Sequence, residues 1–164
     1  MQKCLYFICP TDALESVINN SFNSENYYYT SLGNSINLND RVIASLEDLI
    51  VDKRISEISI IIANDNRIIR DAVEDKSFSE INGLDGFYET IEIQRNFLNV
   101  FWQINKGKDT LLNNFIRNKI KEIQDVLNKL FLNPVKVSGK IYQKRESIFT
   151  DIKLDIPHDF FSLN

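Results

Sequence analysis

The sequence predicts an α/β domain with a central, mostly parallel β-sheet, helices on its faces and a C-terminal hairpin at one edge. Over the first 63 residues, short β-branched or aromatic runs alternate with amphipathic segments of helical period. The links between these segments are short, and a β-α-β-α-β order is typical of a parallel sheet with covered faces. Near the C-terminus, two further strand-like segments flank a short polar turn, and the length of 164 residues suits a single domain spanning 1–164.

The first strand is predicted at 3–9, "KCLYFIC", and Pro10 breaks it. Either Thr11 or Asp12 can cap the short helix that the apolar spacing predicts over 13–22.

The second strand is predicted over 27–32, "YYYTSL", because aromatic residues favour strands, and Gly33 and Asn34 then turn the chain. A clear amphipathic helix follows, capped by Asn39 or Asp40. Its apolar positions are Val42, Ile43, Leu46, Leu49 and Ile50.

The third strand is predicted over 55–63, "ISEISIIIA", and a helix that becomes polar follows over 67–80. A second helical pattern covers 87–104, with Ile91, Leu98, Phe101 and Trp102 expected to face inward. The strongest helix runs over 111–132 and ends before an Asn-Pro pair. The segments "VKVSGKIYQ" and "SIFTDIKL" are expected to pair as a hairpin about "KRE".

The composition, 43% hydrophobic and 26% charged, is ordinary for a globular protein, and no apolar run is long enough to cross a bilayer. The N-terminus lacks the pattern of a signal peptide, so a cytoplasmic protein is expected. Cys4 and Cys9 lie five residues apart on one predicted strand, so their side chains point to opposite faces and a disulfide is not expected. His158 is the single histidine, which leaves few zinc ligands.

Charge is unevenly distributed along the chain. Residues 106–145 carry a local charge of +7, whereas residues 1–105 carry −8. A basic stretch can mark a nucleic-acid surface, but no aromatic nucleic-acid motif accompanies it. We therefore interpret it as a solvated helix face and an edge hairpin whose lysines block strand addition, and nucleic-acid binding is not expected.

The third predicted strand ends in the polar sequence "ANDNR", which covers 63–67. In open α/β sheets, ligands bind at the carboxyl ends of the strands. One interpretation is structural: Asn64 and Asn66 satisfy loop backbone and cap a helix, while Arg67 pairs with Asp65 or Asp12. The other is a small polar pocket in which Arg67 holds a carboxylate or a similar anion.

In order, these segments resemble a β-class carbonic anhydrase. That family's first strand ends in Cys-x-Asp-x-Arg, its second ends in Arg-Asn-Ala-Gly-Asn, and a helix opens near Ser-Leu-Glu. Its third strand ends in Gly-His-x-x-Cys-Gly, and its terminal strand carries Gly-x-x-Tyr. The matching positions here are Cys9, 30–34, 45–47, Gly139 and Tyr142. The resemblance covers most of the chain and implies the family's fold and a dimer or larger assembly.

The departures from this pattern concern the zinc site. The resemblance places the family's Cys, His and Cys ligands at Cys9, Asn64 and Arg67. Asparagine is a poor zinc ligand, and arginine has no lone pair to donate. The Asp-Arg pair is also broken, because aligning Cys9 puts Thr11 and Ala13 in its place, and aligning Asp12 puts Pro10 in place of the cysteine.

The sequence therefore predicts a zinc-free, catalytically inactive carbonic-anhydrase-like module for binding or interaction, with no cofactor and no catalytic residue. The alternative is an enzyme that uses the strand-tip crevice for other chemistry on a small anionic substrate, with Arg67, Asp65, Asp12 and Cys9 as its reactive groups. A homodimer is expected, with a small anion as the ligand class and no membrane association. The candidate crevice residues are Cys9, Asp12, Ser31, Gly33, Asn34, Asn64, Asp65, Asn66 and Arg67.

Overall fold

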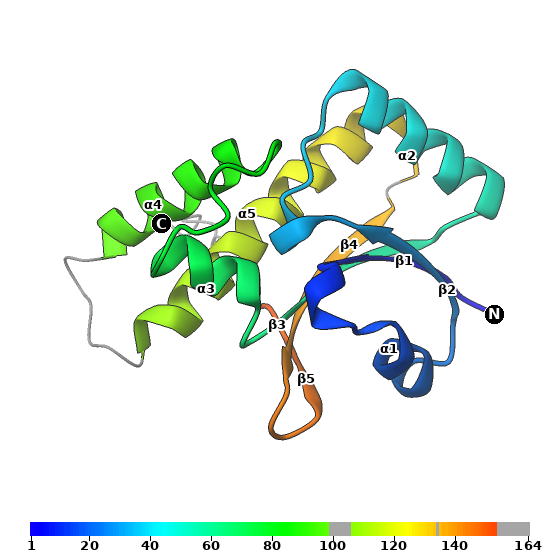
Figure 1. Ribbon diagram of the computed structural model, residues 1–164. Coiled ribbons are helices and arrows are strands. Elements are labelled where there is room, and N and C mark those ends of the chain that lie inside the picture. The colour runs from blue at the N-terminus through cyan, green and yellow to red at the C-terminus, as the bar shows by residue number, and fades with distance from the viewer. Residues whose placement is uncertain (99–105, 134, 154–164) are drawn as a thin grey trace, which may run out of the picture.

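The computed structural model describes residues 1–98, 106–133 and 135–153 (Figure 1). In this part of the chain five strands form one sheet in the order β2-β1-β3-β4-β5. The first four strands are parallel, and β5 runs antiparallel to β4 at one edge. The strands are β1 (Lys3–Ile8), β2 (Glu25–Thr30), β3 (Glu57–Ala63), β4 (Lys136–Gln143) and β5 (Ile148–Asp151).

Helices flank both faces of this sheet, so the predicted α/β class, its mostly parallel sheet and its C-terminal edge hairpin are confirmed. Two single 3₁₀ turns, η1 and η2, follow β1 and β2. The helical elements are η1 (Pro10–Asp12), α1 (Glu15–Ser21), η2 (Leu32–Asn34), α2 (Asp40–Lys53), α3 (Arg67–Val73), α4 (Asp85–Leu98) and α5 (Lys106–Leu130). Phe101 and Trp102, which we expected to face inward, lie outside the described residues.

The two faces of the sheet are covered unequally. Leu5, Phe7 and Cys9 belong to the larger core, which packs against α2, α3, α4 and α5. Cys4 and Tyr6 belong to a smaller core, to which α1 contributes (Figure 1). The two cysteines are buried, free and on opposite faces, as the alternation of a strand predicts.

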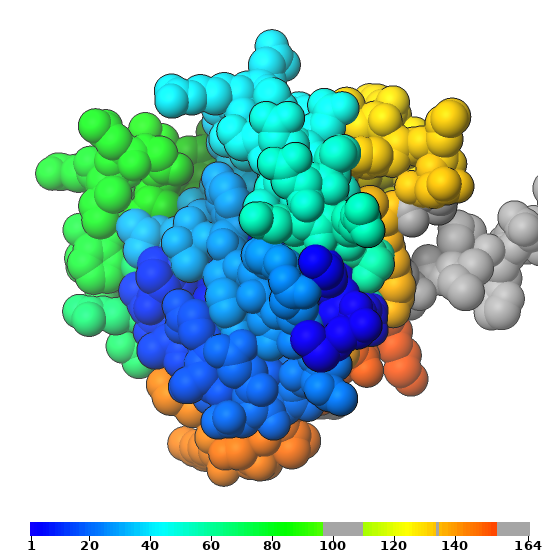
Figure 2. All heavy atoms as spheres, turned by 90° about the vertical axis from the view of Figure 1, so that its right-hand side faces the viewer, coloured from blue at the N-terminus to red at the C-terminus, as the bar shows by residue number. Residues whose placement is uncertain are grey.

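The view onto the β2 edge shows α2 (cyan) above this strand and the tip of the β4–β5 hairpin (orange) projecting below it (Figure 2). Within the described residues, no helix is both long and apolar enough to cross a membrane.

Helix α5 lies close against β4 because Gly139 has no side chain. A Cβ atom at this position would lie 2.4 Å from Ile116 Cγ2 and 2.8 Å from Ile120 Cδ1. Both isoleucines are buried, at 0% and 2% exposure, so neither can swing into solvent to make room. Gly139, which the resemblance singled out, therefore has a packing role in this chain.

The helices α1 and α2 differ in whether a side chain caps their N-terminus. The Asn39 side chain accepts a hydrogen bond from Val42 N at 3.0 Å and so caps α2, as predicted. The expected cap of α1 by Thr11 or Asp12 is wrong, because α1 begins after Leu14 with no side-chain cap. Asp12 is used elsewhere, at the end of β3.

Candidate functional site

Cys9 marks the carboxyl end of β1, where the strand meets the turn after β2. Its side chain is fully buried, at 0% exposure. The thiol sulfur accepts a hydrogen bond from Gly33 N at 3.1 Å and lies 3.0 Å from Thr11 Oγ1. Thr11 takes one position of the broken Asp-Arg pair, and the other, Ala13, is exposed with a φ of 52°. The sulfur is therefore held by local hydrogen bonds at the place where the family's first ligand would lie.

Asp12 ties the end of β1 to the end of β3. One carboxylate oxygen accepts a hydrogen bond from Ala63 N at 2.9 Å, and the other accepts from Asn66 Nδ2 at 2.8 Å. The Asn66 side-chain oxygen accepts from Ile69 N at 2.9 Å and caps α3. Burial raises the pKa of Asp12 to about 6, although both hydrogen bonds oppose this rise.

Gly33 and Asn34 form a left-handed turn, with φ angles of 62° and 55°. A Cβ atom on Gly33 would lie 2.8 Å from Phe87 Cζ, so only glycine fits this position. Asn34 is 2% exposed and donates from Nδ2 to Ile61 O at 2.8 Å. Its Oδ1 is buried without a hydrogen-bond partner among the described residues. Ser31, half-buried, accepts the Asn34 backbone N–H through its carbonyl oxygen at 3.1 Å.

Asn64 and Asp65 face the hairpin rather than β1. Asn64 N donates to Tyr142 O at 3.0 Å, and Asn64 Oδ1 lies 3.4 Å from Lys144 N. Asp65, which is exposed, forms an ion pair with Lys144 Nζ at 3.3 Å. The strand-tip residues thus divide between a cluster that joins β1, η2 and β3 and a pair that holds the hairpin.

Arg67 begins α3, and its side chain is exposed. The expected pairing of Arg67 with Asp12 or Asp65 is wrong, because Asp12 binds Ala63 and Asn66, while Asp65 binds Lys144. The guanidinium carbon instead lies 5.5 Å from the centre of the Phe78 ring. A cavity of about 330 Å³ opens beside it, lined by Arg67, Arg70, Asp71, Asp75, Ser77 and Phe78.

Asp71 positions Phe78 under Arg67, a role that the sequence analysis missed. The Asp71 carboxylate accepts hydrogen bonds from Ser77 N at 3.1 Å, from Phe78 N at 3.0 Å and from the Tyr88 hydroxyl. Burial alone would raise the pKa of Asp71, but these hydrogen bonds outweigh it and lower the pKa. The available signal was the acid Asp71 next to the apolar residues of "IIRDAV", at a position that the structure buries.

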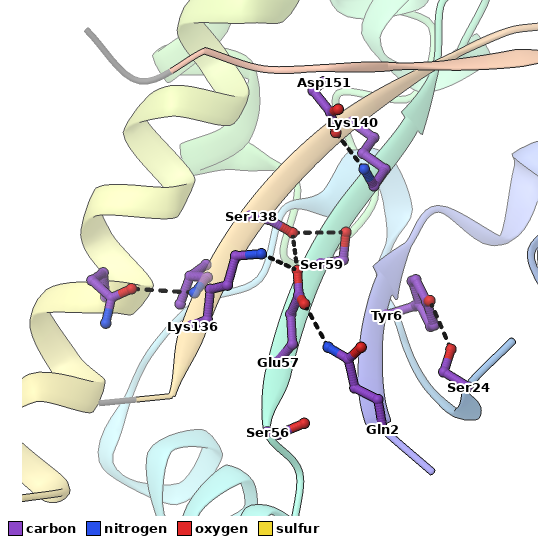
Figure 3. A network of polar contacts seen from close by, with 12 residues as sticks. Gln2, Tyr6, Ser24, Ser56, Glu57, Ser59, Lys136, Ser138, Lys140 and Asp151 are labelled. Atoms are coloured by element: carbon purple, nitrogen blue, oxygen red, sulfur yellow. Dashed lines mark hydrogen bonds and ion pairs between the residues drawn. The ribbon is translucent and has the colours of Figure 1, made fainter. Parts of the chain in front are cut away.

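A second polar cluster, also missed, lies near the amino ends of β3 and β4 (Figure 3). The Glu57 carboxylate accepts from Gln2 Nε2 at 2.8 Å and Ser138 Oγ at 2.9 Å, and it pairs with Lys136 at 3.4 Å. Ser59, which is 2% exposed, lies 3.2 Å from Ser138 Oγ. The available signal was Ser59, a polar residue inside the apolar third strand, which the structure pairs with Ser138 of β4. All of these groups satisfy one another, so the cluster holds strands together.

The donor groups at the strand tips do not fit zinc. Arg67, at one position that the resemblance assigns to a ligand, cannot bind a metal, and Asn64 offers a weak amide oxygen. Cys4 lies on the opposite face, where burial raises the pKa of its thiol to about 11. Among the described residues, which exclude His158, no three His, Cys, Asp or Glu side chains gather in a way that could hold a metal ion.

Several solved structures that this chain resembles are β-carbonic anhydrases. CafA of the fungus Aspergillus fumigatus has a TM-score of 0.73 at 15% sequence identity, covering 94% of this chain and 76% of that chain. Wild-type CafD of the same fungus has a TM-score of 0.71 at 18% identity, covering 93% and 90%. The Coccomyxa enzyme in complex with acetazolamide has a TM-score of 0.70 at 12% identity, covering 92% and 72%.

These likenesses establish a β-carbonic-anhydrase fold for the chain. A further structure with this fold, at a TM-score of 0.62 and 12% identity over 93% of this chain and 81% of that chain, is one of two tetrameric enzymes of Sordaria macrospora. No protein-family model and no curated protein matches the sequence.

Proposed function

We propose that this protein is a zinc-free relative of the β-carbonic anhydrases that does not hydrate carbon dioxide and acts as a binding or interaction module. One observation carries the proposal: Cys9, Asn64 and Arg67 stand where the resemblance puts the three zinc ligands. Cys9 is engaged by Gly33 and Thr11, and Asn64 faces Lys144. Arg67 brings a positive charge that repels a metal cation.

The proposed lack of carbon dioxide hydration follows from the lack of zinc-binding side chains. Bound zinc lowers the pKa of its water to about 7, which supplies hydroxide for attack on carbon dioxide at neutral pH. Without a zinc-binding donor set, this route to a nucleophile is closed. The Cys9 thiol is not paired with a base, because its sulfur contacts Gly33 N and Thr11 Oγ1, neither of which is a base.

The ligand class we propose for the strand tips is a small anion held by Arg67. A guanidinium offers five N–H donors in a planar fork that matches carboxylates and phosphates. The cavity beside Arg67 also presents the exposed Ser77. We further propose a cytoplasmic homodimer, which the implied family assembly supports. The alternative function, an enzyme acting on a small anionic substrate, would use the same cavity.

Metal content after exhaustive dialysis tests the proposal. We expect far less than one zinc per chain by elemental analysis and carbon dioxide hydration at the background rate. An active β-carbonic anhydrase purified in parallel controls for metal loss during preparation. About one tightly held zinc per chain would overturn the proposal.

A restored donor set provides a matched control. The double variant Asn64→His and Arg67→Cys, together with the native Cys9, recreates a Cys-His-Cys set. We expect this variant to retain zinc that the native protein loses, because the resemblance puts the family's three zinc ligands at these positions. If the double variant also fails to retain zinc, these positions are not the ligand positions and the proposal loses its basis.

A further inference from the structure

The cavity beside Arg67 is formed by α3 and the segment that follows it (Figure 1). Its volume of about 330 Å³ lies at the lower end of the roughly 300–1,000 Å³ that is typical of small-molecule sites. The charged side chains in its lining are Arg67, Arg70, Asp71 and Asp75. Because two positive and two negative groups balance formally, the ligand preference depends on which of these charges the protein already uses.

The charge of Asp71 is already used by the protein. Its side chain is 8% exposed. Its two carboxylate oxygens accept three hydrogen bonds, from the backbone N–H groups of Ser77 and Phe78 and from the Tyr88 hydroxyl. Asp71 therefore anchors the wall of the cavity and is not a contact for a ligand.

Arg67 and Asp75 are the two charges that remain free. Both side chains are exposed, and neither forms an ion pair in the part of the chain that the structure describes. Arg70 has an acidic neighbour, since its Nε lies 3.9 Å from Glu74 Oε2. Phe78 restrains Arg67 from the face of the guanidinium, at 5.5 Å from the ring centre, which leaves the N–H groups at the guanidinium edge able to donate.

A cavity with one free positive and one free negative group favours a ligand that carries both charges. A simple anion is attracted by Arg67 and repelled by Asp75, and a simple cation meets the reverse, because the two Coulomb energies have opposite signs. A ligand with a carboxylate and an ammonium is attracted by both groups. The exposed Ser77 in the same lining offers a hydroxyl that can donate to the carboxylate or accept from the ammonium.

We propose that this cavity binds a small zwitterion, an amino acid whose carboxylate pairs with Arg67 and whose ammonium pairs with Asp75. The inference rests on the anion site proposed at Arg67 and names the class of its ligand. The planar fork of the guanidinium supplies most of the affinity, because it can bind a carboxylate through two N–H groups. Asp75 supplies selectivity, because an exposed ion pair contributes only modestly to affinity.

Two matched sets of probes separate the charges. Glycine, acetate and methylamine carry both charges, only the negative or only the positive charge on a short chain, and γ-aminobutyrate, butyrate and propylamine do the same on a longer chain. The backbone amide resonances of Ser77 and Phe78 report binding by NMR at neutral pH and low ionic strength, where salt screens the charges least. In at least one set, the zwitterion should bind the native protein about threefold or more tightly than the carboxylate. The amine should bind most weakly.

The variant Asp75→Asn removes the negative charge and keeps the shape of the side chain. It should abolish the preference for the zwitterion, while carboxylate binding stays the same or becomes tighter. The control Glu80→Gln removes the same charge from an exposed residue that does not line the cavity, and it should keep the native preference. Arg67→Leu should abolish binding of both the zwitterion and the carboxylate.

The results distinguish this inference from the function on which it rests. Carboxylate binding that depends on Arg67 but gains nothing from an ammonium in either set would overturn the inference and leave the proposed anion site in place. A preference for the zwitterion that persists in Asp75→Asn would also overturn it. If neither these probes nor inorganic phosphate bind at millimolar concentration in a way that depends on Arg67, the inference and the proposed anion site both fail.

Discussion

At the scale of single residues, Arg67 has an unexpected environment. We expected an acidic partner, and the guanidinium instead lies over Phe78 beside an open cavity. A charge that needs no buried partner costs little to remove, so the substitution Arg67→Leu should change the free energy of unfolding by less than about 0.5 kcal/mol.

The same substitution should abolish binding of an anion at this cavity. In a thermal-shift screen with phosphate, sulfate, bicarbonate and acetate, we expect at least one anion to raise the melting temperature of the native protein but not of Arg67→Leu. Arg41→Leu, which removes an exposed charge from α2, controls for general salt effects. An equal rise in all three proteins would show that the anion does not bind at Arg67.

Asp12 should make stability depend on pH in a narrow window. Burial raises the pKa of its carboxyl from an ordinary 3.8 to about 6. Between these values the folded state holds a proton that the unfolded state has released. The free energy of unfolding should therefore fall as pH rises from about 4 to about 6, and this contribution should then level off.

The variant Asp12→Asn removes this titration. Urea denaturation of both proteins at intervals from pH 4 to pH 8 gives the difference between their free energies of unfolding. We expect the native protein to lose stability relative to the variant as pH rises to about 6. A difference that stays constant with pH, or that changes in the opposite direction, would contradict a raised pKa.

The sequence located these site residues but not their partners. The sequence analysis placed Cys9, Asp12 and Gly33 in one crevice at the carboxyl ends of the strands. In the structure Gly33 N donates to the Cys9 sulfur, whereas Asp12 binds the end of β3. The partners of Asp12 lie 51 and 54 residues away in sequence. Local sequence favours a helix cap for such an acid, because a cap needs only neighbouring residues, whereas a contact across the sheet depends on the register of β1 against β3.

At the scale of elements, the hydrophobic periodicity of the sequence predicted whether a segment is a helix or a strand better than it predicted where that element begins and ends. The second strand begins at Glu25, two residues before the aromatic run that suggested it, because pairing with β1 extends through Glu25 and Asn26. The third strand begins at Glu57, two residues later than predicted, because its pairing with β1 starts only at Glu57, opposite Cys4. Strand ends are set by the neighbouring strand, which local sequence does not contain.

The contact between α5 and β4 depends on Gly139. The substitution Gly139→Ala places a methyl group 2.4 Å from Ile116 Cγ2, so α5 must shift away from the sheet. We expect a loss of about 1–3 kcal/mol in the free energy of unfolding, as is usual for overpacking, measured by chemical denaturation.

A double-mutant cycle with Ile116→Ala separates overpacking from other effects. Ile116→Ala alone leaves a cavity and should cost about 2–5 kcal/mol. In that background the contact with Ile116 Cγ2 is gone and the 2.8 Å approach to Ile120 Cδ1 remains, so Gly139→Ala should cost less than it does in the native background. Additive losses would show that crowding against Ile116 is not the cause.

At the scale of the whole molecule, folding redistributes the charge asymmetry of the sequence. The lysines of the basic stretch meet acids from distant segments: Lys136 pairs with Glu57 at 3.4 Å, and Lys144 pairs with Asp65 at 3.3 Å. Lys140 pairs with Asp151 across the hairpin. The positive charge that looks continuous along the chain is therefore interrupted on the surface, which supports the interpretation that it is not a nucleic-acid site.

This arrangement predicts that the native protein does not bind nucleic acid. In a gel shift with mixed duplex and single-stranded oligonucleotides at low and moderate salt, we expect no retardation at micromolar protein concentration. The double variant Glu57→Gln and Asp65→Asn removes the partners of two lysines while leaving every basic residue in place. It should bind weakly at low salt and lose that binding as salt rises, because counterion release governs such contacts. Micromolar binding by the native protein that falls steeply with salt would show that the basic residues form an accessible surface despite their acidic partners.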